Sequence, residues 1–238
     1  MSATPGVVRN SVDRRLFAWA AVVVLLVAVG GFARTYYVKV AFDTPALSAL
    51  VHLHAALMTM WIALFVVQTR FIAAHRIDLH RRAGVFGVVL IVSIVAVGIP
   101  TAIASARHGI TVPGMSPLMF LVLPLGTAIV FALFASAAVL YRRRSDIHKR
   151  LMLLATLSIL TPAIARVPWD AFRAVGPLLF LGLTDAIVLA FVIYDTVRNR
   201  RLHPAFGWGT LLLFASQPLR MLLAHTAAWN EFAIWLTG

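Results

Sequence analysis

Seven long apolar runs constrain the fold of this chain more than any other feature of its sequence. Each run approaches the length that an α-helix needs to cross a bilayer, roughly 20 residues. Because the bilayer interior offers no partners to open backbone groups, runs of this kind must fold as helices. The runs are Leu16–Ala33, Leu47–Gln68, Ala83–Ser105, Pro117–Tyr141, Leu151–Val167, Pro177–Tyr194 and Phe206–Trp229. We therefore expect an all-α fold, a seven-transmembrane helix bundle.

The runs and the short loops between them predict a single integral membrane domain over residues 1–238. Its expected organisation is a lone helix at 16–33 followed by three hairpins at 47–105, 117–167 and 177–229. The fifth run is the shortest and contains Pro162. Since proline removes a helix hydrogen bond, this position predicts a kink. Any activity must then lie within the bundle or at its two faces.

Composition and charge exclude several classes of protein. Hydrophobic residues make up 61% of the 238 and charged residues 12%, as expected of a membrane protein. Cysteine is absent, which excludes disulfides, iron–sulfur clusters and thiolate ligation. The two lysines, Lys39 and Lys149, lie outside the runs, so no retinal Schiff base can form within the membrane.

The net charge of +13 is concentrated on one side of the predicted membrane. Fifteen of the 21 lysines and arginines lie in the amino-terminal tail and in three short turns between runs. The positive-inside rule places the N-terminus and these turns in the cytoplasm and the C-terminus in the periplasm. We therefore expect a multi-pass protein of the bacterial inner membrane, with the lipid bilayer as its partner and no nucleic acid.

The three basic turns share a pattern. Arg-x-Asp-x-His ends at His80 and recurs at His148, 68 residues later, whereas the third turn keeps only the arginine, His203 and the aliphatic residue before it. In one interpretation the pattern fixes topology: Asp78 and Asp146 favour helix starts and the cations orient the hairpins. In the other, His80, His148 and His203 converge as metal or haem ligands. The sequence leaves both open.

Polar side chains inside the runs are costly unless they are paired, so they mark candidate sites. At about 1.5 Å of rise per residue, several of them lie roughly 9–13 Å beneath the outer end of their helices. With neighbours closer to the surface, the candidates for a pocket in the outer half are His52, His54, Arg166, Asp185, Gln217, Arg220 and His225.

Helical geometry restricts how these side chains can combine. His52 and His54 are two residues apart and point in nearly opposite directions, so they predict one ligand and not a chelating pair. Asp185 and Arg220 reach similar depths on consecutive helices, which predicts an ion pair. Either that pair clamps the last hairpin, or it belongs to an outer pocket with His52 or His54 as the titrating group.

The chain also resembles a group of uncharacterised bacterial multi-pass membrane proteins. The residues that carry the resemblance are His52, Trp61, Gln68, Arg76-x-x-x-His80-Arg81-x-x-Gly84, His148-Lys149-Arg150-Leu151-Met152 and Arg166. The group has a domain of unknown function in which Leu-His-Arg-x-x-Gly and His-x-x-x-Met open helices. The resemblance covers roughly residues 45–235; it implies a membrane fold and localisation and no particular activity.

A second resemblance concerns cofactors. The Leu-His-Arg-x-x-Gly helix start is similar to those of membrane b-type cytochromes and ferric-reductase-like bundles, in which paired histidines hold haem. For this chain the resemblance implies haem b, and the histidines themselves leave a transition metal open as the alternative. His52 or His54 with His225 would form an outer pair, and His80 with His148 an inner one.

Three hypotheses about function follow. The first is a haem- or metal-binding redox or cofactor-handling protein that uses the outer residues, with the arginines suited to an anionic group. The second is a carrier or receptor for a small anionic or amphipathic ligand. The third is an assembly factor or subunit of a membrane complex or oligomer, with the small-residue face Gly84–Gly87 as its seam. No catalytic residue is assigned, and whether the protein is an enzyme stays open.

Overall fold

The computed structural model describes residues 5–42, 44–168 and 175–238, and every regular element in these ranges is helical. The predicted all-α fold is confirmed. The elements are α1 (Pro5–Phe32), a π-helical turn (Ala33–Tyr37), a 3₁₀ turn (Lys39–Phe42), α2 (Ala49–Ala73), α3 (Ile77–Arg107), α4 (Pro117–Phe120), α5 (Val122–Leu140), α6 (Ser145–Ser158), α7 (Thr161–Ile164), α9 (Pro177–Asn199), α10 (Pro204–Ala224) and α11 (Ala227–Thr237).

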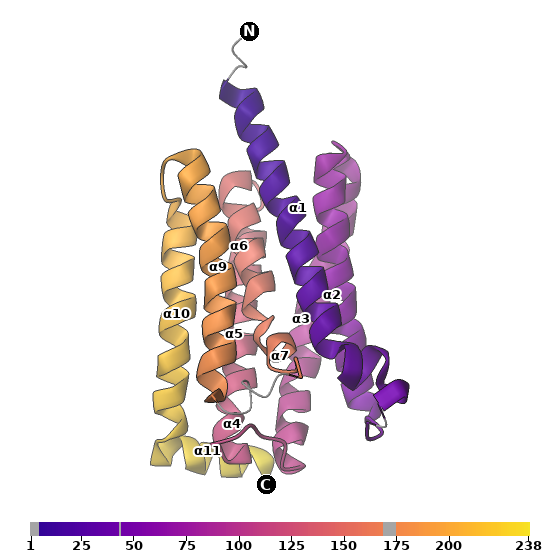
Figure 1. The fold of residues 1–238 in the computed structure, drawn as a ribbon, viewed down its shortest axis with the longest axis vertical. Helices are drawn as coiled ribbons and strands as arrows, with labels where there is room; N and C mark the ends of the chain where they lie inside the picture. Colours follow the sequence, from indigo (N-terminus) through magenta and orange to yellow (C-terminus); the bar gives the residue numbers. More distant parts are fainter. Residues whose placement is uncertain (1–4, 43, 169–174) are drawn as a thin grey trace.

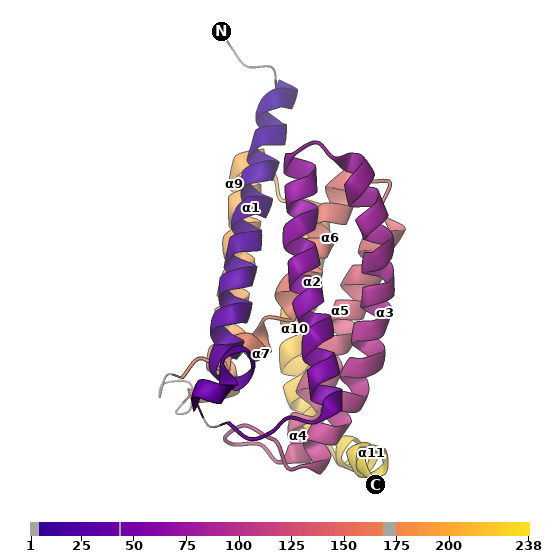
Figure 2. The same cartoon turned by 90° about the vertical axis from the view of Figure 1, so that its right-hand side faces the viewer.

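The long helices run side by side along one axis, and α11 lies across one end of the bundle (Figures 1 and 2). The two termini lie at opposite ends (Figure 1). The turns 74–76, 141–144 and 200–203 all lie at the end nearer the N-terminus, and we call this the basic end. The opposite end is called the α11 end.

Six stretches of the described chain are long and apolar enough to cross a membrane, which supports a multi-pass membrane protein. They are Arg14–Tyr37, Ala49–Ala73, Ile77–Arg107, Pro117–Leu140, Ser145–Ile164 and Pro177–Asn199. The seventh predicted run becomes two helices: α10 runs along the bundle, and α11 turns away from it after His225 (Figure 1). Large apolar side chains such as Val85, Leu140 and Leu222 point outward, as expected of a lipid-facing surface.

The centre of the bundle is α6. It packs against α1, α5, α9 and α10, and Leu153, Leu154 and Leu157 on it are fully buried. The stretch that contains it has a mean hydropathy of 1.3, against 2.0 to 2.5 for the other five stretches. A helix enclosed by protein need not be apolar on every face, because its neighbours satisfy its polar groups. This explains why a short, less apolar run lies at the core.

The central helix ends early, as Pro162 predicts. Helix α6 stops at Ser158, and the short helix α7 begins at Thr161 with Pro162 in its first turn. The bend carries α7 against α1, where a Cβ atom at Gly31 would overlap the Ala163 carbonyl group. Glycine is therefore required at this crossing of the two backbones.

The small-residue face of α3 is not an external seam. A Cβ atom at Gly87 would lie 3.2 Å from Leu64, and one at Gly84 would lie 3.8 Å from the Gln68 side chain. Both partners belong to α2, so the face Gly84–Gly87 closes the α2–α3 hairpin internally. The expectation that it is free to join another subunit is wrong.

Candidate functional site

The repeated basic turns bring two of their histidines together. His80 and His148 occupy equivalent positions near the starts of α3 and α6, and their ring centroids lie 6.3 Å apart with the planes at 83°. The hairpins α2–α3 and α5–α6 place them there, because α3 packs on α5 and both hairpins turn at the basic end. The two histidines of the predicted inner pair, His80 and His148, thus lie with their rings in edge-to-face contact.

The nitrogen atoms of these two rings are not equivalent. His148 Nδ1 lies 2.8 Å from the Ala138 carbonyl oxygen. A carbonyl can only accept, so Nδ1 carries a proton, and in the neutral form of the ring Nε2 has the lone pair. His80 Nδ1 is buried and finds no hydrogen-bond partner among the described residues. The pair therefore presents ring nitrogens that protein groups do not use.

Gln68 completes this cluster from α2. Its Nε2 donates to the His80 carbonyl oxygen at 3.2 Å, while its Oε1 is buried and lacks a partner within the described part of the chain. The cluster therefore contains two buried polar atoms, His80 Nδ1 and Gln68 Oε1, that the described protein groups do not satisfy. We call His80, His148 and Gln68 the histidine pair site.

At the same end of the bundle, α6 also holds a buried ion pair that the sequence did not predict, with Asp195 of α9. Arg150 donates to both carboxylate oxygens of Asp195, from Nε at 3.0 Å and from Nη2 at 2.8 Å. Asn199 donates to Asp195 Oδ1 at 3.1 Å, and Arg150 Nη1 donates to the Asp146 carbonyl at 2.8 Å. In the sequence, Arg150 is one of several cations that follow a basic turn, and Asp195 directly follows the last residue of an apolar run, Tyr194. The available signal was an aspartate in the last turn of an apolar run, facing a side of the membrane that is rich in arginine.

His203 is held apart from the histidine pair. Its Nδ1 accepts from the Ala205 amide at 3.2 Å and caps α10, so its Nε2 carries the proton and donates to Asp146 Oδ2 at 3.3 Å. Burial lowers the pKa of His203, the nearby Arg150 charge lowers it further, and the Asp146 carboxylate opposes both. Within the described ranges no group of three or more histidine or acidic side chains could hold a metal. The predicted convergence of His80, His148 and His203 is therefore wrong.

Towards the α11 end, Asp185 and Arg220 do not form the direct ion pair that was expected. In the described structure Gln217 donates to Asp185 Oδ1 at 2.6 Å, and Arg220 acts on Asp185 only at longer range. Arg220 donates to the Leu123 carbonyl at 3.3 Å and to Thr127 Oγ1 at 3.0 Å. Gln217 is thus the direct partner of Asp185, one turn before Arg220 on α10.

Arg220 is fixed between two helices. Its Nε and Nη2 also donate to the Ser216 carbonyl and hydroxyl, at 3.0 and 3.2 Å. Its aliphatic stem lies over Gly126 of α5, where a Cβ atom would overlap the Arg220 Cδ. Protein acceptors from α5 and α10 therefore occupy the guanidinium, and the residue acts as a clamp between these helices.

His52 and His54 point to different neighbours, which confirms the expectation from their spacing. His52 is exposed, with its ring 5.7 Å from that of Tyr36. His54 is half-buried, and a Cβ atom at Gly98 of α3 would lie 3.6 Å from its ring. Its Nδ1 is buried with no partner in the described ranges, and Arg166 is close enough to act on it electrostatically.

The expected outer pair with His225 is not assembled. His225 is exposed at the end of α10, and its Nδ1 lies 2.7 Å from the Met221 carbonyl. Helix α2 packs on α1 and α3, whereas α10 packs on α5, α6 and α9, so His225 lies away from His52 and His54. Arg166 donates to the Pro162 carbonyl at 2.9 Å and lies 4.8 Å from the Phe32 ring centroid. The outer residues therefore form separate contacts, and the histidine pair site is the strongest candidate.

Comparison with known proteins adds no relative: no family model, no curated protein and no solved structure matches this chain. What the site can bind must therefore be inferred from the donor atoms of its own side chains. Two imidazoles are ligands that suit a transition metal such as zinc, copper, iron or nickel.

Proposed function

We propose that this protein is a multi-pass protein of the bacterial cytoplasmic membrane that binds a transition-metal ion through His80 and His148, in a redox or cofactor-handling role. The observation that carries the proposal is the approach of the two rings, 6.3 Å between centroids, beside the unpartnered His80 Nδ1. With metal–nitrogen bonds of about 2.0–2.1 Å, two imidazoles that share one ion have ring centres roughly 5–6.5 Å apart.

The surroundings of the pair support metal ligation. A ligating histidine usually donates its other ring nitrogen to a carbonyl, which fixes the tautomer. The Ala138 carbonyl has this relation to His148. Gln68 contacts His80 through the hydrogen bond from its Nε2 to the His80 carbonyl oxygen. An ion bound between the two rings would give the buried His80 Nδ1 a partner.

Copper is the first metal to test. Met152 follows His148 by four residues and lies on the same side of α6. A thioether beside imidazole favours Cu(I) over the harder divalent ions. A singly charged ion is also less opposed by the many arginines of the basic end than a divalent ion would be.

The topology proposed with this function has the basic end in the cytoplasm and α10 as a seventh span, which places the C-terminus in the periplasm. The concentration of cations in the turns at this end supports that orientation. The histidine pair site would then lie near the cytoplasmic surface, within reach of a cytoplasmic donor or acceptor of metal.

Haem b is the second cofactor to test, and optical spectra separate the two. Protein purified from haem-replete cells is recorded oxidised and after dithionite reduction. A Soret band that disappears in His80→Asn or His148→Asn would assign haem to the same pair. A band lost only in His54→Asn would move the cofactor to the side of Arg166 and would overturn the proposed site.

A carrier or receptor of small anions that acts through Arg220 is less well supported. Its guanidinium already makes four hydrogen bonds to protein atoms, so a ligand would have to displace them. The unpartnered His54 Nδ1 beside Arg166 is the feature that best suits this alternative. Thermal stabilisation by an anionic ligand that is lost in Arg166→Gln, with the metal content unchanged, would favour it.

A further inference from the structure

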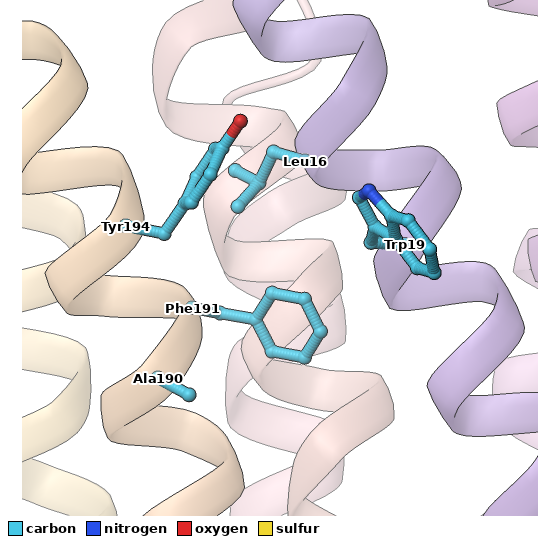
Figure 3. Close-up of a pocket in the computed structure, with 5 residues that line it drawn as sticks. All are labelled: Leu16, Trp19, Ala190, Phe191 and Tyr194. Carbon is cyan, nitrogen blue, oxygen red and sulfur yellow. The ribbon is translucent and has the colours of Figure 1, made fainter.

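An apolar groove runs between α1 and α9 on the outside of the bundle. It has a volume of about 140 Å³ and is lined by Leu16, Trp19, Ala190, Phe191 and Tyr194. Figure 3 shows the Phe191 ring reaching from α9 towards α1, with the Trp19 indole on the α1 side. Leu16 and Phe191 are buried and form its floor, whereas Trp19 is 64% exposed at its rim.

Two arginines lie between the groove and the basic end. Arg15 precedes Trp19 by one turn of α1 and is exposed. Arg198 follows Tyr194 by one turn of α9, is exposed, and has its Cζ 5.6 Å from the Tyr194 ring centroid. The N-terminus of α1 and the C-terminus of α9 both lie at the basic end, so both arginines lie one helical turn from the groove on its basic-end side.

This order of groups along the membrane normal matches a phospholipid. Acyl chains need an apolar channel, tryptophan and tyrosine favour the level of the headgroups, and arginine binds phosphate with two parallel hydrogen bonds. We propose that the groove between α1 and α9 holds one anionic phospholipid, with an acyl chain along Phe191 and Ala190 and the phosphate between Arg15 and Arg198. The site is independent of the histidine pair site, which lies on α3 and α6.

The charge of the mouth selects anionic over zwitterionic lipid. Each basic residue near a membrane surface contributes about fivefold to the affinity for anionic lipid, so the two arginines together contribute about 25-fold. The groove alone would hold an acyl chain of any lipid. A preference for phosphatidylglycerol over phosphatidylcholine is therefore the signature of this site.

The test measures lipid retention by native mass spectrometry and the Tm of detergent-solubilised protein with added phosphatidylglycerol or phosphatidylcholine. We expect one retained phosphatidylglycerol and a larger rise in Tm with phosphatidylglycerol. The double variant Arg15→Gln/Arg198→Gln should lose this preference, with affinity reduced about 25-fold. Ala190→Trp should fill the groove at an exposed position and abolish retention while both arginines remain.

The matched control is Arg82→Gln/Arg143→Gln, which removes two exposed charges at the same end, on α3 and in the turn between α5 and α6. It should leave retention unchanged. Equal stabilisation by both lipids would overturn the proposal. So would an equal loss in the control, because lipid would then respond to the overall charge of the basic end and not to a built site.

Discussion

Replacing Asp195 with asparagine is expected to destabilise the bundle by about 3–5 kcal/mol, the usual cost of removing one partner of a buried ion pair. Asp195 and Arg150 have side chains only 1% and 5% exposed, and two hydrogen bonds of 2.8 and 3.0 Å join them. Asparagine is neutral and has one oxygen and one NH₂ group where aspartate has two carboxylate oxygens. The charged guanidinium of Arg150 would therefore lose its negative partner and at least one hydrogen-bond acceptor. Burial of both side chains keeps solvent from compensating for the lost carboxylate.

The assay is reversible unfolding in mixed micelles, followed by Trp fluorescence. The matched control removes an exposed aspartate at another basic turn. Asp78 pairs with Arg76 at 3.2 Å, with side chains 55% and 56% exposed. Because solvent screens an exposed pair, Asp78→Asn should cost far less than Asp195→Asn. The double variant Arg150→Met/Asp195→Leu should recover most of the loss, since it leaves no unpaired charge. Equal losses for Asp195→Asn and Asp78→Asn would refute the reasoning.

Two other predictions concern Gly126 and His203. Gly126→Ala should destabilise the protein by about 1–3 kcal/mol, because the hydrogen bonds of Arg220 prevent its stem from moving aside. Gly182→Ala on α9 has open space around it and should stabilise the protein by about 0.5–1 kcal/mol. Unfolding measurements on both variants check this, and a neutral Gly126→Ala would contradict it. The folded-state pKa of His203 lies below its unfolded value of 6.5, so its contribution to stability is present above pH 6.5 and declines as the pH falls. In His203→Asn, which keeps the cap, that part of the pH dependence should disappear; an unchanged profile would exclude His203 as its source.

Hydropathy predicted which segments become helices but not how those helices are rotated. The apolar runs and Pro162 correctly predicted the all-α bundle and the break between α6 and α7. Depth along a helix suggested that Asp185 and Arg220 would meet. Rotation about the helix axes decided otherwise, since Arg220 faces α5 and Gln217 faces Asp185.

The repeated basic turns predicted the site better than the depths of polar residues along their helices did. Equivalent positions in two hairpins brought His80 and His148 together, whereas His225 and His54, grouped only because both lie in the outer half of their predicted helices, lie on helices that are not neighbours. Helical spacing remained a sound guide within one helix, as the divergence of His52 and His54 shows. Contacts between helices depend on side-chain packing, which a single sequence does not specify.

The metal content of the purified protein tests the central proposal most directly. Protein loaded with Cu(I) or Zn(II) and freed of excess metal is analysed by mass spectrometry for metal per chain, alongside His80→Asn, His148→Asn and the exposed control His225→Asn. We predict one ion per chain in the wild type and in His225→Asn, with affinity reduced at least about 100-fold in either variant of the pair, since each removes one of two imidazole ligands. A wild-type protein that retains no metal, or a loss equally large in His225→Asn, would contradict a metal site at His80 and His148.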